Sequence, residues 1–339
     1  MRSLMPRRSS RAAVVAVAAA AMLALSACGG GSDSDADAAP ADAETSAGGA
    51  FPATVETKFG PVEVEKKPER VVALGWSDAE IALALGVQPV GASDWLAFGG
   101  EGVGPWSEGQ YTTAPEILGT MELEYEKVAA LKPDLILDTK SSGDQTRYDT
   151  LAKIAPTVGI PTGGENWITT PDEQITMIST ALGVPEQGEK LISDTAAEFA
   201  KYAEENPEFA GKTITVGSKT SEGYGAYVDG DTRVDFATKL GFKNNPTIQE
   251  QATEAFSVNL SAENLKQLDA DLVVMMPIGL DAKDITGDPL FEAVPAVKSG
   301  HSVVLDDLDI SNAFSSGSPA ATSYALEKVV PMFKETLAK

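Results

Sequence analysis

The sequence has very little cysteine and histidine: its 339 residues include one of each, Cys28 and His301. A disulfide within the chain needs a second cysteine, and protein zinc sites use several histidine or cysteine ligands. An internal disulfide is therefore excluded, and a zinc or manganese carrier is not indicated. No GxSxG motif accompanies His301, so a Ser-His-Asp hydrolase is not indicated either. No catalytic constellation replaces it, and we predict no enzymatic activity and no cofactor.

Positive charge is also scarce. Lysine and arginine number 26 against 50 aspartates and glutamates, which gives a net charge of -24. A nucleic-acid partner is excluded, because no basic stripe is present to neutralise phosphates. Such charge suits an exported surface that stays soluble and monomeric by self-repulsion. Any anionic ligand then has to be held by locally placed cations. A P-loop is absent as well, so an ATPase would have to be a separate chain.

The first 50 residues predict export and anchoring. Residues 1–27 combine a basic start with the apolar run AAVVAVAAAAMLALSA, the order of a signal peptide, and the run is short for a membrane span. Leu25 to Cys28 resembles the bacterial lipobox, which implies lipidation of Cys28; the alternative is an ordinary signal peptide with an incidental cysteine. Residues 28–50 lack large apolar side chains and predict a flexible acidic tether. We therefore expect a lipid-anchored protein on the extracytoplasmic side of the cell membrane.

One amphipathic helix is predicted over 186–206, where Pro185 precedes it and Pro207 ends it. Strand and helix patterns alternate on both sides of it, which predicts an α/β fold with parallel-rich sheets. We predict an N-terminal lobe at 51–185 and a C-terminal lobe at 207–339, joined by this helix. Ligands of such sheets bind beyond the carboxyl ends of the strands. The loops in question follow Leu74, Ser93, Thr139, Ser218 and Met276.

Several segments resemble one family over residues 60–338. They include PERVVALGWSDAEIALALGVQPVGAS, PEILGTMELEYEKVAALKPDLIL, LAKIAPTV and LSAENLKQLDADLVVMMP. They are similar to the substrate-binding proteins of iron-siderophore ABC importers, a group that also contains haem and vitamin B12 carriers. The resemblance implies two Rossmann-like lobes joined by one rigid helix (class III), and capture of a ferric siderophore for a membrane permease.

The same resemblance assigns two surface glutamates to permease docking. Glu126 precedes the VAALKPD segment, and Glu263 lies in LSAENL, one in each lobe. Each is expected in the first turn of a helix, where a carboxylate is also favoured by the helix dipole. That local role is the alternative for either residue alone, and the occurrence of one in each lobe favours docking.

A ferric siderophore coordinates its own iron, so the protein needs cations and aromatic surfaces and no metal ligands. The residues that follow predicted strands, where the family places ligand contacts, are Trp76, Trp95, Lys140, Arg147, Tyr148, Trp167, Lys219, Tyr224, Tyr227 and Arg233. Lys140 and Lys219 hold the same relative place in each lobe and predict a cationic pair. Tyr148 has the alternative of a core residue, and Arg233 of a surface pair with Asp229 or Asp231.

Two other functions stay open at this point. In the first, the chain is the same kind of receptor but its ligand is haem or a cobalamin, although the lack of a suitable histidine disfavours haem. A protein of another class, an exported enzyme or a cell-surface interaction protein, is compatible with the fold, because fold alone does not set function. For the receptor, one stiff connecting helix predicts a largely preformed cleft with modest closure.

Overall fold

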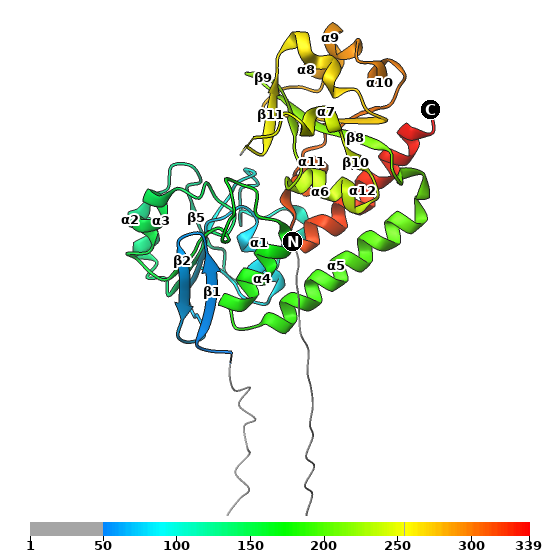
Figure 1. Cartoon of the computed structure of the whole chain (residues 1–339). Coiled ribbons are helices and arrows are strands. Elements are labelled where there is room, and N and C mark those ends of the chain that lie inside the picture. The colour runs from blue at the N-terminus through cyan, green and yellow to red at the C-terminus, as the bar shows by residue number, and fades with distance from the viewer. Residues whose placement is uncertain (1–49, 254) are drawn as a thin grey trace, which may run out of the picture. The chain divides into compact units, whose positions relative to one another are not determined.

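The computed structural model describes residues 50–253 and 255–339 (Figure 1). The described residues all belong to one compact unit. The predicted signal peptide, Cys28 and almost all of the acidic segment lie outside the described residues. Within the described ranges, no helix combines the length and the apolar character needed to cross a membrane.

The chain before the long helix α5 (Pro185–Glu205) forms what we call the N-terminal lobe. Its strands are β1 (Ala53–Thr57), β2 (Gly60–Val64), β3 (Val71–Ala73), β4 (Gly91–Ser93), β5 (Glu116–Leu118), β6 (Leu135–Leu137) and β7 (Thr157–Val158). Its helices are α1 (Asp78–Ala84), η1 (Pro105–Ser107), α2 (Tyr125–Ala130), α3 (Gln145–Leu151) and α4 (Pro171–Ala181). The order β5-β4-β3-β6-β7 makes an all-parallel sheet, and β1 and β2 form a separate hairpin.

The chain after α5 forms the C-terminal lobe. Its strands are β8 (Thr213–Thr220), β9 (Gly223–Tyr227), β10 (Lys243–Asn244), β11 (Ser257–Leu260), β12 (Leu272–Pro277) and β13 (Ser302–Val304). Its helices are η2 (Pro207–Phe209), α6 (Thr232–Lys239), α7 (Pro246–Gln249), η3 (Ala262–Leu268), α8 (Lys283–Thr286), α9 (Pro289–Glu292), α10 (Pro295–Lys298), α11 (Leu308–Ser316) and α12 (Pro319–Leu337). The sheet order is β11-β9-β8-β12-β13, with β10 beside the start of β8.

The second sheet is mixed, because β9 runs antiparallel to both β8 and β11. A tight turn closes the β8–β9 hairpin, and Gly223 there has a φ of 132°, which glycine tolerates best. Because of this hairpin, Tyr224 and Tyr227 lie within strand β9 and not in a loop beyond β8. The alternating strand–helix pattern of the sequence does not reveal the hairpin.

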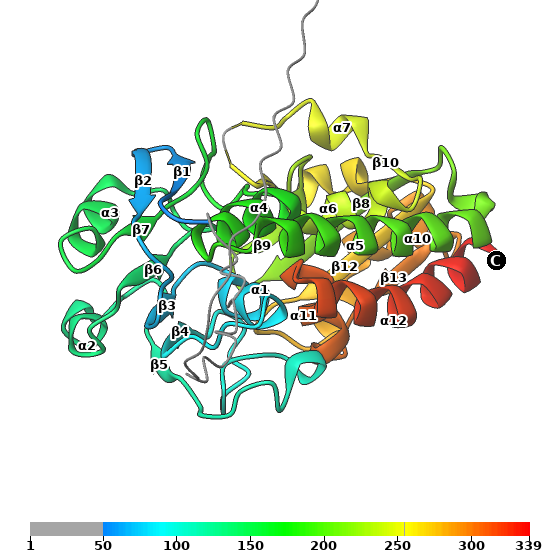
Figure 2. The same cartoon turned by 90° about the horizontal axis from the view of Figure 1, so that it is seen from below.

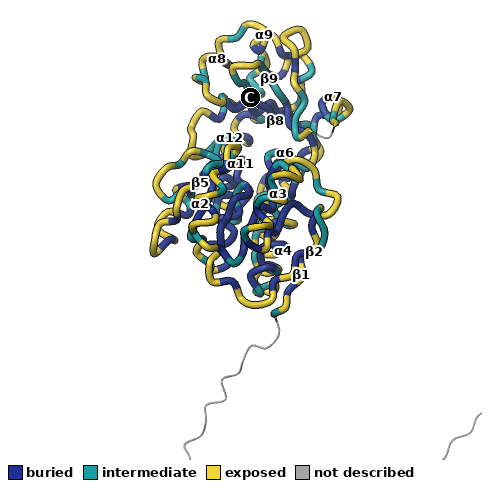
Figure 3. The backbone as a smooth tube through the Cα atoms, turned by 90° about the vertical axis from the view of Figure 1, so that its left-hand side faces the viewer, coloured by how far each residue is buried: buried dark blue, intermediate teal, exposed yellow. Residues whose placement is uncertain are grey.

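Both main sheets are buried on both faces, as alternate side chains show. Val71 joins a core with β1, β2, α1 and α4, whereas its neighbour Val72 joins one with α2 and α3. In the second sheet, Val274 faces a core with α6, α11 and α12, and Val273 faces one with α9 and α10. Figure 3 shows the buried strands within both lobes. Doubly covered sheets of this kind confirm the predicted α/β class.

The helix α5 connects the two lobes and packs along α12 (Figures 1 and 2). The predicted range was 186–206, and the observed helix is shifted by one residue toward the N-terminus at both ends. The start of α12 also packs against α1 of the N-terminal lobe. The division into lobes at 51–185 and 207–339 stays a prediction, because these parts belong to one compact unit.

Candidate functional site

A pocket of about 360 Å³ lies between the two lobes. From the N-terminal lobe it is lined by Trp76, Trp95, Met121, Lys140 and Trp167, and from the C-terminal lobe by Asp231, Thr232, Arg233, Phe256 and Ser315. Its volume is within the range of small-molecule sites. Five of the ten residues that the sequence predicted for ligand binding are in this lining: Trp76, Trp95, Lys140, Trp167 and Arg233.

The carboxyl ends of neighbouring strands bring Trp76 and Lys140 together. The Trp76 backbone N–H donates to the Lys140 carbonyl oxygen over 2.9 Å, joining the segments that follow β3 and β6. Gly75 permits this approach, since a Cβ atom there would lie 2.9 Å from the Lys140 nitrogen and 2.3 Å from an Asp78 carboxylate oxygen. Any larger residue at position 75 would push the two loops apart.

Asp78 holds the loops after β3 and β6 together through hydrogen bonds. Its buried carboxylate accepts hydrogen bonds from the Gly75 N–H, from the Thr139 N–H and hydroxyl, and from the Gln174 side-chain amide. Burial raises the pKa of Asp78 to about 6, although the Thr139 donors oppose the rise. The loops that carry Trp76 and Lys140 are therefore held in place by a buried polar network, which favours a preformed site.

Three indole rings form one wall of the pocket. Trp95 stacks near Trp76, with centroids 6.1 Å apart, and meets Trp167 edge-on at 4.7 Å. The Trp95 ring N–H donates to the Leu74 carbonyl at the end of β3 over 2.9 Å. The ring N–H of Trp76 is buried and has no hydrogen-bond partner within the described residues. The wall thus presents broad aromatic surface with few polar atoms, which suits a bulky, partly apolar ligand.

The start of α6 supplies the opposite, charged wall. Asp231 caps this helix and accepts two side-chain hydrogen bonds from Arg233 at 2.8 and 2.6 Å. The Arg233 guanidinium carbon lies 3.5 Å above the ring centroid of Tyr227. Tyr227 also stacks near Phe256, another lining residue. Tyr227 therefore supports the wall from behind and is not itself in the lining.

Lys140 crosses from the N-terminal lobe to the C-terminal lobe. Its ammonium group donates to the hydroxyl of Thr232, and its side chain is almost completely buried. Burial lowers the pKa of Lys140 to about 8, although the carboxylates of Asp231 and Asp235 partly counteract the effect. Near neutral pH the amine is therefore still largely charged, at a cost to stability.

We expect Lys140→Met to unfold less readily than the parent at pH 7. The amine has a pKa of about 8 when folded and 10.5 as a reference, so the unfolded chain binds more protons between these values. The free energy of unfolding of the parent therefore rises with pH between about 8 and 10.5. At pH 7 the charged Lys140 lowers that free energy by about 3 kcal/mol. Urea unfolding should show an advantage for the variant at pH 7 that shrinks by pH 10.

The exposed residue Lys190 offers a matched control. Lys190→Met removes the same charge from the surface of α5 and should change stability by less than about 1 kcal/mol at either pH. A Lys140→Met variant that is less stable than the parent at pH 7, by an amount independent of pH, would contradict a strained buried ammonium.

The other predicted contacts in the N-terminal lobe lie outside the lining. Arg147 donates two hydrogen bonds to Asp138, at 2.9 and 3.1 Å, and one to the Thr120 carbonyl. Tyr148 stacks on Phe59 with centroids 4.0 Å apart, so it packs within the lobe as its alternative proposed. Both side chains are engaged by neighbours of their own lobe, which the order of residues around β6 does not reveal.

Lys219 and Tyr224 also lie away from the pocket lining. The Lys219 amine donates to the Asp288 carboxylate at 2.8 Å and to the Asp284 carbonyl at 2.6 Å. Tyr224 donates to the same Asp288 carboxylate and stacks on Phe291. Lys219 therefore does not join Lys140 in the lining, where the second cation is Arg233.

Four lining residues, Met121, Thr232, Phe256 and Ser315, were not predicted from the sequence, and Asp231 was predicted only as a possible ion partner of Arg233. Asp231 had a signal, the helix-capping position two residues before Arg233. Phe256 and Ser315 come from segments with no pattern that points to a cleft. Only the three-dimensional approach of the two lobes places them there.

A polar contact joins the lobes beside the pocket. The Ser77 hydroxyl donates to the Ser316 carbonyl over 2.6 Å, and the Ser316 hydroxyl donates to the buried carboxylate of Glu80 over 2.8 Å. Glu80 also accepts from the Trp106 ring N–H over 2.7 Å. The Ser77 side chain stands just before α1 but makes no capping bond to it and reaches the other lobe instead.

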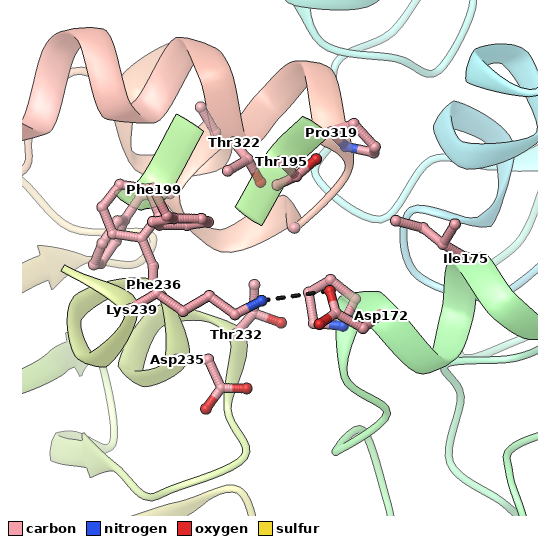
Figure 4. A pocket seen from close by; sticks show the side chains of 14 residues that line it. Asp172, Ile175, Thr195, Phe199, Thr232, Asp235, Phe236, Lys239, Pro319 and Thr322 are labelled. Carbon is pink, nitrogen blue, oxygen red and sulfur yellow. Dashed lines mark hydrogen bonds and ion pairs between the residues drawn. The ribbon is translucent and has the colours of Figure 1, made fainter. Parts of the chain in front are cut away.

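A second crevice lies where α4 meets α6 (Figure 4). Lys239 and Asp172 form an ion pair across it at 3.4 Å, and Phe199 of α5 packs edge-on against Phe236. Its volume is about 20 Å³, room for about one water molecule. This crevice is a packing seam between helices, and it is too small for an organic ligand.

Metal-ligating side chains do not gather anywhere in residues 50–253 and 255–339: no group of three histidine, cysteine, aspartate or glutamate side chains is placed to hold an ion. His301 is half-buried in the connection between α10 and β13, apart from the pocket lining. The pocket offers a ligand aromatic surface, the Lys140 ammonium, the Arg233–Asp231 ion pair and the hydroxyl groups of Thr232 and Ser315.

Known proteins share this architecture. The probable siderophore-binding lipoprotein YfiY of Bacillus subtilis is 25% identical over 308 residues, covering 84% of this chain and 88% of the relative. The structure of PiaA from Streptococcus pneumoniae in complex with ferrichrome superposes with a TM-score of 0.74 at 28% identity, covering 84% of this chain and 99% of PiaA. A periplasmic solute binding protein from Mycobacterium smegmatis superposes with a TM-score of 0.71 at 26% identity, covering 84% and 98%. The family described as "Periplasmic binding protein" matches residues 71–308, and the chain belongs to this family.

Proposed function

We propose that this chain is the extracytoplasmic receptor of an ABC importer, and that it captures a ferric siderophore and delivers it to a membrane permease. The observation that carries this proposal is the pocket between the lobes, walled by Trp76, Trp95 and Trp167 and faced by Lys140 and Arg233. The names of YfiY and PiaA support it, since one is called siderophore-binding and the other holds ferrichrome.

The chemistry of the pocket agrees with a ligand that brings its own coordination shell. Iron in a siderophore is bound by the organic donors, so the protein has to recognise only the outside of the complex. Indole faces pack against the apolar parts of such a ligand, and hydroxyl and cationic groups contact its oxygen atoms. A substrate-binding role needs no nucleophile, and we propose that the chain has no enzymatic activity.

Haem or a cobalamin is the second candidate, because each is also a bulky metal chelate. Haem bound by a protein takes an axial ligand such as histidine, methionine, cysteinate or tyrosinate. Among the described residues, Met121 is the only one of these types in the lining of the pocket. Tyr227, which lies behind the lining, donates its hydroxyl hydrogen to Ser218 and carries Arg233 on its face. The described lining holds no histidine, cysteine or tyrosine, which disfavours haem, and the titration below separates the ferric siderophore from a cobalamin.

The binding test uses the four tryptophans as reporters, three of which line the pocket. Titration with a ferric siderophore should quench the intrinsic fluorescence saturably, with a dissociation constant of about 1 µM or tighter. Haem and cobalamin should give no saturable change beyond the absorbance correction. Saturable quenching by haem or cobalamin alone would transfer the proposal to that ligand.

We further propose that Glu126 and Glu263 dock the permease. Both are exposed, Glu126 in the first turn of α2 and Glu263 in the first turn of the 3-10 helix η3. The variants that test this role reverse the charge at each position, E126R and E263R. The family resemblance implies that each glutamate meets arginines of the permease. Each variant should bind the ligand within about twofold of the parent yet lower uptake by at least about tenfold, because its arginine would then meet those like charges, which costs several kcal/mol.

The matched control is E189R on the exposed surface of α5, which changes the net charge equally. Its uptake should equal that of the parent in the same ⁵⁵Fe-siderophore transport assay. Equal loss of binding and uptake in E126R or E263R would remove the docking role. We place the protein at the cell membrane through Cys28 and expect it to act as a monomer.

We also propose only modest closure on the ligand. The lobes already touch through Ser77, Glu80 and Ser316, and α5 is a single helix without a proline beyond its first turn. A continuous helix resists bending more than an extended linker does. Small-angle scattering of the free and liganded protein should therefore give nearly equal radii of gyration.

A further inference from the structure

The cations that were expected to attract an anionic ligand already have carboxylate partners. Arg147 pairs with Asp138 at 2.9 Å, and Lys219 pairs with Asp288 at 2.8 Å. Arg233, which does line the pocket, pairs with Asp231 at 2.6 Å, and both of these side chains are largely buried. Because each pair is close to neutral, these arginines and lysines supply little net positive charge to a ligand.

Among the residues that the structure describes, three in the lining are charged: Lys140, Asp231 and Arg233. The negative charge of Asp231 neutralises the positive charge of Arg233, so the ammonium of Lys140 is the one unbalanced charge among these three. That ammonium already donates to Thr232, and the carboxylate of Asp235 lies near enough to affect it. The pocket thus carries about one positive charge, in a chain whose net charge is -24.

Ferric siderophores differ strongly in charge. Three hydroxamates each lose one proton on binding, so together they neutralise Fe³⁺. Three catecholates each lose two protons, and their ferric complex carries three net negative charges. Ferric complexes of hydroxycarboxylates are also anionic. An anion with several charges would enter a mostly apolar pocket with about one cation to meet it, and desolvating the remaining charge is costly.

We propose that the pocket selects ferric chelates that lack net negative charge, which is the trishydroxamate class, over ferric triscatecholates and hydroxycarboxylates. The three indoles, Phe256 and Met121 contact the organic body of the chelate, and the Thr232 hydroxyl, which accepts from Lys140, donates its hydrogen to an amide or hydroxamate oxygen. This inference rests on the proposed function, since it names the class of siderophore bound at the same site.

The test measures the affinity of the whole mature protein for two ferric probes by isothermal titration calorimetry, at an ionic strength of about 0.15 M. One probe is ferrichrome, a neutral trishydroxamate, and the other is the ferric complex of a tris-catechol siderophore. We expect ferrichrome to bind at least about 100-fold more tightly. Equal or tighter binding of the triscatecholate would overturn the inference and leave the proposed function standing. Failure of every ferric chelate to bind would overturn both.

A single substitution tests whether charge is the cause. Asp231→Asn removes the carboxylate that neutralises Arg233, and asparagine still caps a helix, so α6 keeps its start. The triscatecholate should then bind at least about tenfold more tightly than it binds the parent, and the preference for ferrichrome over the triscatecholate should fall by at least the same factor. Asp194→Asn, on the exposed face of α5, makes the same change in net charge and should alter neither affinity.

The two variants separate the local charge from the net charge of the chain. An unchanged triscatecholate affinity in Asp231→Asn, with thermal unfolding like that of the parent, would show that charge does not set the selectivity and would overturn the inference. An equal gain in triscatecholate affinity in Asp194→Asn would also overturn the inference, because the higher affinity would then come from the net charge of the whole protein.

Discussion

Replacement of Trp95 by alanine is expected to weaken ferric siderophore binding by about 100-fold, or roughly 2.7 kcal/mol. Trp95 is the central ring of the aromatic wall, 6.1 Å from the Trp76 centroid and 4.7 Å from that of Trp167. Its removal deletes one contact with the ligand and also leaves the two neighbouring rings without support. Isothermal titration calorimetry with ferrichrome measures the loss directly.

Trp95→Phe separates the ring from its polar tip. Phenylalanine keeps an aromatic face between Trp76 and Trp167 but loses the hydrogen bond to the Leu74 carbonyl. We expect a loss of about tenfold or less for this variant, since one net hydrogen bond contributes ~1 kcal/mol. An alanine variant that folds like the parent and binds within about threefold of it would show that this wall is not the binding surface.

Replacement of Arg147 by alanine is expected to lower the free energy of unfolding by about 3–5 kcal/mol. Asp138 is 3% exposed, and two of the hydrogen bonds that it accepts come from the Arg147 guanidinium. Burial already raises the pKa of Asp138, and the arginine opposes that rise. Without Arg147 the carboxylate would be buried and unpaired. Urea unfolding at pH 7 gives the measurement.

The loss in Arg147→Ala should shrink at pH 5. An unpaired buried carboxylate has a raised pKa when folded, so the folded state binds more protons and gains stability as the pH falls. Lys190→Ala, which breaks the exposed ion pair with Asp194 on α5, should cost less than about 1 kcal/mol at both values. A cost below about 1 kcal/mol for Arg147→Ala would contradict a structural role for this pair.

The sequence was sufficient for the fold and for one wall of the site because both depend on local patterns. Prolines bracket the connecting helix, and the parallel-sheet rule places loops such as those of Trp76 and Lys140 at one edge. These features need only the order of strands and helices. The family resemblance then extended them to the whole chain, in agreement with the match over residues 71–308.

The rest depends on contacts between distant segments. Lys219 pairs with Asp288, 69 residues later, and no local pattern predicts that partner. Tyr224 was predicted in a loop because the sequence pattern after β8 does not distinguish a hairpin from a crossover connection. In the structure β9 pairs antiparallel with β8, and Gly223 lies next to the turn between them with a positive φ. Phe256 and Ser315 reach the pocket only because the second lobe folds over the first. Charge neutralisation in particular could not be read from composition.

The position of the bound iron tests the proposed function most directly. Crystals grown with ferrichrome would locate it directly through the anomalous scattering of iron. We predict one strong peak in the pocket between the lobes, flanked by the indoles of Trp76, Trp95 and Trp167 and facing the start of α6. A peak outside that pocket, for example in the surface groove that Phe98 and Asp309 line, would contradict binding between the lobes.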